Sequence, residues 1–172
     1  MPQFRNIVLT TDLSANADAA APYALELAAK YGATVHLVHV FEDILYTGVL
    51  ADGSMGYNPT GWLEEAEKER KNQLHILASS MSAPDNVRVI PHYLRGNPIT
   101  EVLNFARMNN ADCIVLSTHG RTGFSHLLFG SVAEKIVRTS PCPVLTIKPV
   151  QVAEKHEAAM AAAQCPANDF AM

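Results

Sequence analysis

Short apolar runs alternate with segments of helical period along almost the whole chain, and this alternation most constrains the fold. Five runs are rich in β-branched and aliphatic side chains, as in strands buried within a parallel sheet. They occupy residues 7–10, 34–41, 87–94, 113–116 and 143–148. Helical segments separate them, and right-handed crossovers then require one parallel sheet with helices on both faces. The sequence therefore predicts a single α/β domain built on an open, doubly wound, five-stranded, Rossmann-like sheet.

Residues with turn and capping preferences mark the ends of these elements. An alanine-rich helix should run to about residue 30 and end at Gly32. Further helices are expected over residues 63–81, from Asn97-Pro98 onward, and over residues 131–139. Pro91 lies inside the third apolar run and cannot donate to a strand ladder, so that run is expected at an edge of the sheet.

Composition excludes several classes of protein. Of the 172 residues 48% are hydrophobic and 17% charged, which is typical of a globular domain. A net charge of −4 gives no basic surface for nucleic acid or a membrane. No apolar run approaches the ~20 residues of a transmembrane helix, and we expect no secretion signal at the start. The three cysteines, at positions 113, 142 and 165, form no CxxC pair, so a reducing cytoplasm is expected.

The glycines that could bind a phosphate follow the fourth apolar run, at positions 120, 123 and 130. The turn after the first run, TTDLSANAD, contains no GxGxxG, and the chain contains no GxxxxGK[ST]. Glycines after a strand let the backbone turn its amides toward an anion, and Gly130-Ser131 then opens a helix whose N-terminus favours phosphate. A purely structural alternative is that Ser131 and Glu134 form a capping box.

Histidines do not form a metal set in this pattern. His36 and His39 are three residues apart on one expected strand and so face opposite sides. His39 is instead expected to support the core or a loop.

The stretch STHGRTGFSHLLFGSVAEKIVR, followed by SPCPVLTIK, resembles the universal stress protein family. IVLTTDLS and VHLVHV near the start extend the resemblance, which covers roughly residues 4–149. Nucleotide-binding members of that family carry Gly-x2-Gly-x9-Gly-Ser/Thr; here Ser117 replaces the first glycine, and Gly120 and Gly130-Ser131 match the rest. The resemblance implies the adenine nucleotide alpha hydrolase-like form of the fold. It also implies a domain over residues 1–149. The composition of the remaining residues, 150–172, predicts a tail that is flexible or partly helical.

The resemblance further implies a role for each matching residue. Asp12 would bind the ribose or a phosphate-bound Mg²⁺, and Val40 would offer its backbone to adenine. Leu116 and Ser117 would line the ribose end of the site. The implied nucleotide-binding set is Thr10, Asp12, Val40, Leu116, Ser117, Gly120, Arg121, Thr122, Gly123, Gly130, Ser131 and Val132. From the residues alone, Asp12 could equally be a turn residue, Val40 a core valine and Arg121 a solvated loop side chain. Thr10 stands where nucleotide-binding relatives often have proline.

The expected function is that of a stress-response regulatory module that binds ATP, ADP or AMP, with Mg²⁺ and with at most slow hydrolysis. Two alternatives remain open. Ser117 could narrow the pocket and leave a nucleotide-free dimeric scaffold, or the domain could serve an ATP-dependent ligase or nucleotidyl transferase. The resemblance also implies a homodimer paired through the fifth apolar run, where Val144, Leu145 and Ile147 lie.

Overall fold

The computed structural model describes residues 3–42, 60–118 and 130–149. Strands and helices alternate along these residues as the sequence predicts. In chain order the elements are β1 (Asn6–Thr10), α1 (Ala15–Asp18), α2 (Ala21–Tyr31), β2 (Thr34–Phe41), α3 (Thr60–Ser80), β3 (Arg88–Arg95), α4 (Pro98–Met108), β4 (Cys113–Ser117), α5 (Ser131–Thr139) and β5 (Val144–Ile147).

The five strands form one parallel sheet in the order β3-β2-β1-β4-β5. From β1, the chain adds β2 and then β3 on one side of the sheet. It then crosses back, so that β4 pairs with the other side of β1 and β5 lies beyond it. The predicted α/β fold is therefore confirmed, with its switch point between β1 and β4. Pro91 lies in β3, which pairs only with β2 among the described strands, so its expected edge position is also confirmed.

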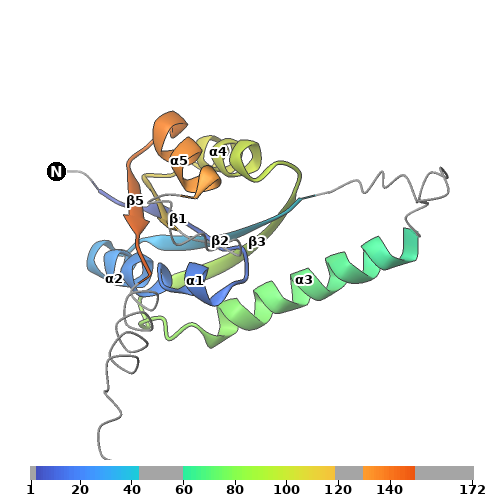
Figure 1. Cartoon of the computed structure of the whole chain (residues 1–172). Coiled ribbons are helices and arrows are strands. Elements are labelled where there is room, and N and C mark those ends of the chain that lie inside the picture. Colours follow the sequence, from blue (N-terminus) through green and yellow to red (C-terminus); the bar gives the residue numbers. More distant parts are fainter. Residues whose placement is uncertain (1–2, 43–59, 119–129, 150–172) are drawn as a thin grey trace, which may run out of the picture.

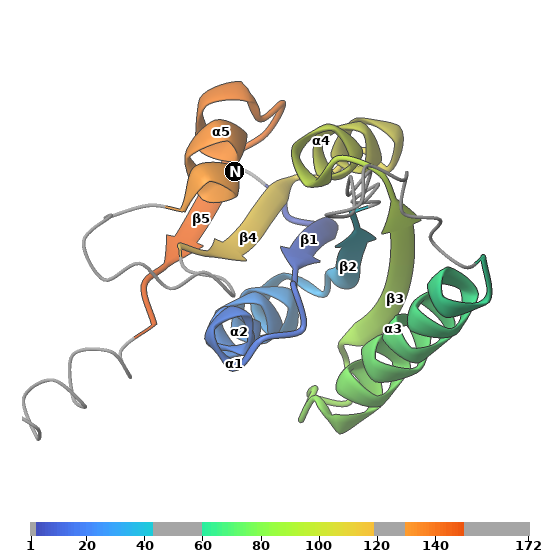
Figure 2. The ribbon, with the colours of Figure 1, turned by 45° about the vertical axis from the view of Figure 1, so that its right-hand side comes forward.

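Helices cover both faces of the sheet: α1, α2 and α3 lie on one side, and α4 and α5 on the other (Figures 1 and 2). Side chains of β1 alternate between the two layers, since Ile7 and Leu9 pack into the cluster that contains α2, whereas Val8 packs against α4 and α5. All three are at most 1% exposed. Full burial of each such side chain contributes about 1.5–3 kcal/mol, so burial on both faces explains why the strands read as continuous apolar runs.

The first helical segment differs from the expectation. One helix was predicted up to about residue 30, but the structure contains two, α1 and α2. Ser14 caps α1 by accepting the N–H of Ala17 at 3.3 Å. Pro22 lies in the first turn of α2, where a missing N–H is tolerated, whereas the interior of one long helix would lose a hydrogen bond there. Gly32 ends α2 in the left-handed conformation (φ 67°), as predicted.

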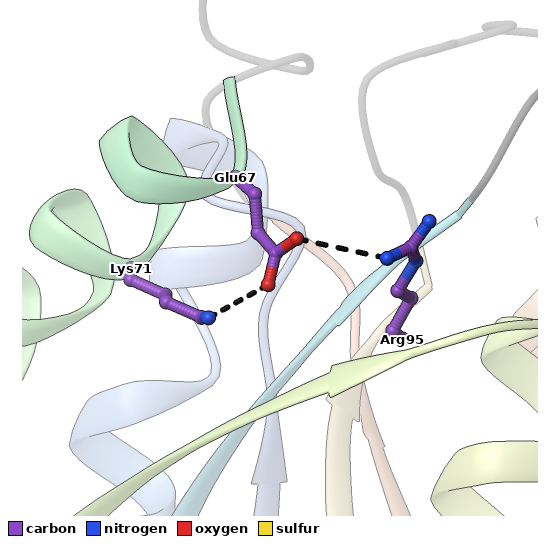
Figure 3. Close-up of polar contacts among 3 residues, drawn as sticks. All are labelled: Glu67, Lys71 and Arg95. Atoms are coloured by element: carbon purple, nitrogen blue, oxygen red, sulfur yellow. Dashed lines mark ion pairs between the residues drawn. The ribbon is translucent and has the colours of Figure 1, made fainter. Parts of the chain in front are cut away.

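Helix α3 lies along the edge strand β3 and is joined to the end of that strand by charged side chains (Figure 3). Glu67 pairs with Lys71 of the same helix at 2.6 Å and with Arg95 of β3 at 3.8 Å. Lys71 also lies 4.9 Å from the ring centroid of Tyr93. Partly exposed pairs of this kind contribute about 0–1 kcal/mol each. The buried Leu74, which is 2% exposed, therefore contributes more to holding α3 on the sheet, and the charged groups fix the position of the helix.

Candidate functional site

A cavity of about 350 Å³ opens at the carboxyl ends of β1, β2 and β4, where the strand order reverses. Its volume falls within the roughly 300–1,000 Å³ of small-molecule sites, and its place is where doubly wound sheets bind ligands. The lining residues are Thr10, Thr11, Asp12, Ala17, Val38, Val40, Glu42, Pro98, Val102, Leu116, Ser117, Thr118, Gly130, Ser131, Val132, Ala133 and Ile136.

Every described member of the set predicted from the sequence lines this cavity. These residues are Thr10, Asp12, Val40, Leu116, Ser117, Gly130, Ser131 and Val132. The other four, Gly120, Arg121, Thr122 and Gly123, lie outside the described residues. The same space is also lined by Glu42, Pro98 and Val102, which were not predicted from the sequence. Their place in the chain could have indicated two of them, because Glu42 directly follows β2 and Pro98 begins α4 just beyond β3.

Backbone hydrogen bonds join the two residues that flank segment 119–129. The N–H of Gly130 donates to the carbonyl of Thr118 at 2.8 Å, and the N–H of Thr118 donates to the carbonyl of Ile147 at 2.8 Å. A Cβ atom at position 130 would lie 3.1 Å from the Thr118 oxygen. The φ angle of Gly130 is −67°, which any residue adopts, so the close approach of the backbone is what favours glycine here.

Helix α5 begins without a side-chain cap. Gly130 is the N-cap residue and Ser131 is already the first helical residue. Glu134 pairs with Arg138 at 3.0 Å. The alternative of a capping box between Ser131 and Glu134 is therefore wrong, because the helix starts one residue earlier than that motif needs. The first-turn amides lack intrahelical acceptors, and the residues that carry them line the cavity, which creates a favourable place for an anion.

Asp12 lies in the turn after β1 with its carboxylate held by Ser14. Ser14 donates its backbone N–H to Oδ1 of Asp12 at 3.0 Å and donates its hydroxyl to the same oxygen. Asp12 is thus a turn residue and a cavity-lining carboxylate at once. Local desolvation and then the negative charge of Asp12 raise the pKa of Asp18 above its ordinary value, so Asp12 acts on a second carboxyl nearby.

The backbone of Val40 faces the switch point. The N–H of Thr11 donates to the carbonyl of Val38 at 2.9 Å, whereas the N–H of Gly96 donates to that of Phe41 at 3.0 Å. Successive residues of a strand direct their peptide groups to opposite sides, so those of Val40 point the same way as those of Val38. Strand β1 ends at Thr10, and the N–H and C=O of Val40 therefore extend past it toward the cavity.

His39 supports the loop that carries Asp12. Its side chain is 3% exposed, and its Nδ1 lies 2.9 Å from the carbonyl oxygen of Thr11. Because a carbonyl only accepts, Nδ1 carries the proton and donates it. The expectation that His39 supports the core or a loop is confirmed.

The charged side chains that line the described part of the cavity, Asp12 and Glu42, are both acidic. A phosphate chain would therefore need helix amides and a cation to be held there. The described residues contain no cluster of three side chains suited to hold a metal ion.

A sequence profile of the universal stress protein family matches residues 3–148. The chain belongs to this family. It is 32% identical over 145 residues to universal stress protein MJ0531 of Methanocaldococcus jannaschii, across 84% of this chain and 82% of that protein. The structure of UspA from Lactobacillus plantarum superposes with a TM-score of 0.63 at 22% identity, covering 84% of this chain and 98% of that one. The universal stress protein from Archaeoglobus fulgidus in complex with dAMP gives a TM-score of 0.54 at 23% identity, covering 86% and 100%. Both structural likenesses support the fold.

Ser117 is the residue that departs from the glycine motif of the nucleotide-binding members. It ends β4, is half-buried and lies in the cavity wall. A cavity of about 350 Å³ is present with the serine side chain in place, so that side chain does not fill it. In the described part of this universal stress protein, no helix combines the length and apolar character needed to cross a membrane.

Proposed function

We propose that this universal stress protein binds ATP, or the related ADP or AMP, together with Mg²⁺ in the switch-point cavity. It would act as a stress-response regulatory module in the cytoplasm, with at most slow hydrolysis. One observation carries the proposal: residues chosen for nucleotide binding from β1, β2, β4 and α5 line a single cavity. The dAMP complex of the Archaeoglobus fulgidus relative supports an adenine nucleotide as the kind of ligand.

The chemistry of the cavity wall suggests an orientation for the ligand. The peptide groups of Val40 offer one donor and one acceptor to the edge of an adenine ring, and Val38 and Leu116 supply apolar surface. Asp12 would contact the ribose or the Mg²⁺ ion. The phosphates would then lie at the start of α5, where Gly130, Ser131 and Val132 line the cavity, and near Gly120 to Gly123 with Arg121 and Thr122.

We propose slow hydrolysis because two candidate bases among the described residues, Asp12 and His39, are already engaged in hydrogen bonds. Efficient phosphoryl transfer to water needs a group that orients the water. The carboxylate of Asp12 already accepts two hydrogen bonds from Ser14, and the Nδ1–H of His39 is engaged with Thr11. A turnover number above the ~1 s⁻¹ low end of typical enzymes, with water or another acceptor, would favour the ligase or transferase alternative.

Isothermal titration of the full chain with ATP and MgCl₂ tests binding directly, and a denatured extract of the purified protein reports co-purified adenine nucleotide. We expect saturable 1:1 binding per chain. No saturation at millimolar ATP would instead favour the nucleotide-free scaffold. Ser117→Gly would then test whether the serine side chain prevents binding.

We also propose that the chain forms a homodimer through β5. This strand pairs only with β4 among the described strands, so none of those strands covers its outer backbone edge. Leu145 is 38% exposed, whereas Ile147 is buried and Val144 is half-buried against the α4–α5 layer. Of the three residues predicted for this interface, Leu145 offers the most side-chain surface, and the backbone edge would supply the rest.

The cysteines of the described part, Cys113 and Cys142, are free thiols, which suits the proposed cytoplasmic location. We further propose that the domain ends near residue 149. The family match ends at residue 148, and the proposed tail, residues 150–172, lies outside the described residues.

A further inference from the structure

Two histidines that do not line the cavity themselves face each other across neighbouring strands. Nδ1 of His36 in β2 lies 3.0 Å from Nε2 of His92 in β3. They are diagonal neighbours, since the register pairs His36 with Ile90 and Val38 with His92. Both side chains are half-buried. The amide oxygen Oδ1 of Asn6, in β1, lies 3.4 Å from the other ring nitrogen of His36, so three adjacent strands contribute to the group.

The hydrogen-bond partners assign the protons of this pair. The oxygen of Asn6 accepts, so Nε2 of His36 carries the proton and Nδ1 presents its lone pair. Nε2 of His92 then donates to Nδ1 of His36. If one further proton binds to Nδ1 of His36, that nitrogen becomes a donor. The hydrogen bond then survives only when the proton of His92 moves from Nε2 to Nδ1 of the same ring, so that Nε2 can accept. A second proton places two N–H groups against each other at 3.0 Å, and the hydrogen bond is lost.

Helix α4 covers the pair through Phe105, whose ring centroid lies 4.6 Å from that of His92 and 5.8 Å from that of His36. The charged residues on the surrounding elements are Arg5, Arg88, Arg95, Glu101, Arg107 and Asp112. Asp112 accepts the backbone N–H groups of Arg5 and Asn6, Arg107 bonds Asn104 of its own helix, and Arg95 pairs with Glu67. Among the described residues no carboxylate contacts either imidazole, so a proton gained there is not compensated by an ion pair.

We propose that His36 and His92 form a proton-sensitive latch. In the neutral state they bond to each other beneath Phe105 and hold α4 on the sheet; in acid they repel and loosen the helix. Helix α4 also carries Pro98 and Val102, which line the cavity, so acid would alter one wall of the candidate site.

The titration behaviour agrees with this geometry. Burial, and then the neighbouring His92, lowers the pKa of His36, and burial lowers the pKa of His92. Both folded-state pKa values thus lie below the unfolded value of about 6.5, so the unfolded chain binds more protons as the pH falls below that value. The folding equilibrium constant should then fall by up to about tenfold per pH unit for each proton not taken up by the folded state.

Urea unfolding of the full chain at pH 7.5, 6.5 and 5.5 tests the latch, and no nucleotide is needed. In His92→Gln the amide can still donate to His36 but cannot bind a proton. As the pH is lowered from 7.5 to 5.5, we expect the folding equilibrium constant to fall more steeply in the unmodified protein than in His92→Gln. The matched control is His75→Gln on the exposed surface of α3, which should keep the steeper dependence. Equal pH dependence in the unmodified protein and His92→Gln would overturn the proposal.

Two measurements on the unmodified protein guard against a variant that fails to fold. The imidazole NMR resonances of His36 and His92 should titrate below the ordinary value of about 6.5, and titration of both at or above it would refute the latch. Amide exchange in α4, corrected for the intrinsic rate, should speed up relative to α2 between pH 7.5 and 5.5. An equal change in the two helices would refute it as well. If these results hold but ATP binds at no pH, the proposed function fails and the latch stands.

Discussion

Replacing Gly130 by valine separates the ligand-binding role of the α5 N-terminus from its structural role. The conformation of Gly130, φ −67° and ψ 152°, is open to valine, so the substitution introduces no backbone strain. The new Cβ would lie 3.1 Å from the carbonyl oxygen of Thr118, which must move by a few tenths of an ångström. The branched side chain would also stand beside the first-turn amides of α5, which line the cavity.

The structure sets different magnitudes for the two effects. Crowding of the Thr118 carbonyl costs about 1–3 kcal/mol, as overpacking commonly does, and the loss of glycine's freedom in the unfolded chain returns about 0.4–1 kcal/mol. The free energy of unfolding should therefore fall by no more than about 2.6 kcal/mol. The affinity for MgATP should fall at least tenfold, about 1.4 kcal/mol or more, because phosphate can no longer reach the amides.

Isothermal titration with MgATP and urea unfolding measure these two quantities on the same preparations. Gly32→Ala is the matched control, because Gly32 has a left-handed φ of 67° but nothing within 4 Å of an added Cβ. It should cost about 1 kcal/mol of stability and leave the affinity unchanged. A folded Gly130→Val protein with unmodified ATP affinity would contradict the reasoning, as would an equal loss of affinity in Gly32→Ala.

Three further substitutions have defined outcomes. Asp12→Asn should reduce the affinity for ATP about tenfold in the presence of Mg²⁺ and less in EDTA, as measured by titration calorimetry. An equal loss of affinity in both would refute the proposed contact of Asp12 with the metal. Ser14→Ala should lower the free energy of unfolding by about 1 kcal/mol in urea, because it removes the cap of α1 and a bond to Asp12. Leu145→Asp should shift the proteins from dimer to monomer in light scattering, because a carboxylate would be placed at the exposed edge of β5; a mutant that stays wholly dimeric would place the interface elsewhere.

The sequence predicted the sheet because burial on both faces leaves a local pattern. Ile7, Val8 and Leu9 are each required to be apolar, whichever layer they face, and Pro91 marks the outer strand without any knowledge of the partner. The described residues predicted for the site line one cavity, since parallel strands that end at the same edge bring their following loops together. These rules depend on residue type and order, which the sequence contains.

Other features depend on where an element starts or how two strands align, and the sequence does not contain these directly. A shift of one residue at the start of α5 replaces the expected Ser131 cap with Gly130. Pro22 lies in the first turn of α2, where proline is tolerated, and so marks the start of a second helix. The alanines around it favour a helix on both sides and therefore gave no boundary. The contact of His36 with His92 requires the register of β2 against β3, which no local pattern of either strand specifies.

The hydrogen bonds from Gly130 to Thr118 and from Thr118 to Ile147 have one more consequence. They form a two-step path of peptide groups from the start of α5 to the outermost strand. A nucleotide bound as proposed at the start of α5 would therefore be linked, through main-chain hydrogen bonds alone, to the strand that we propose pairs with a second copy.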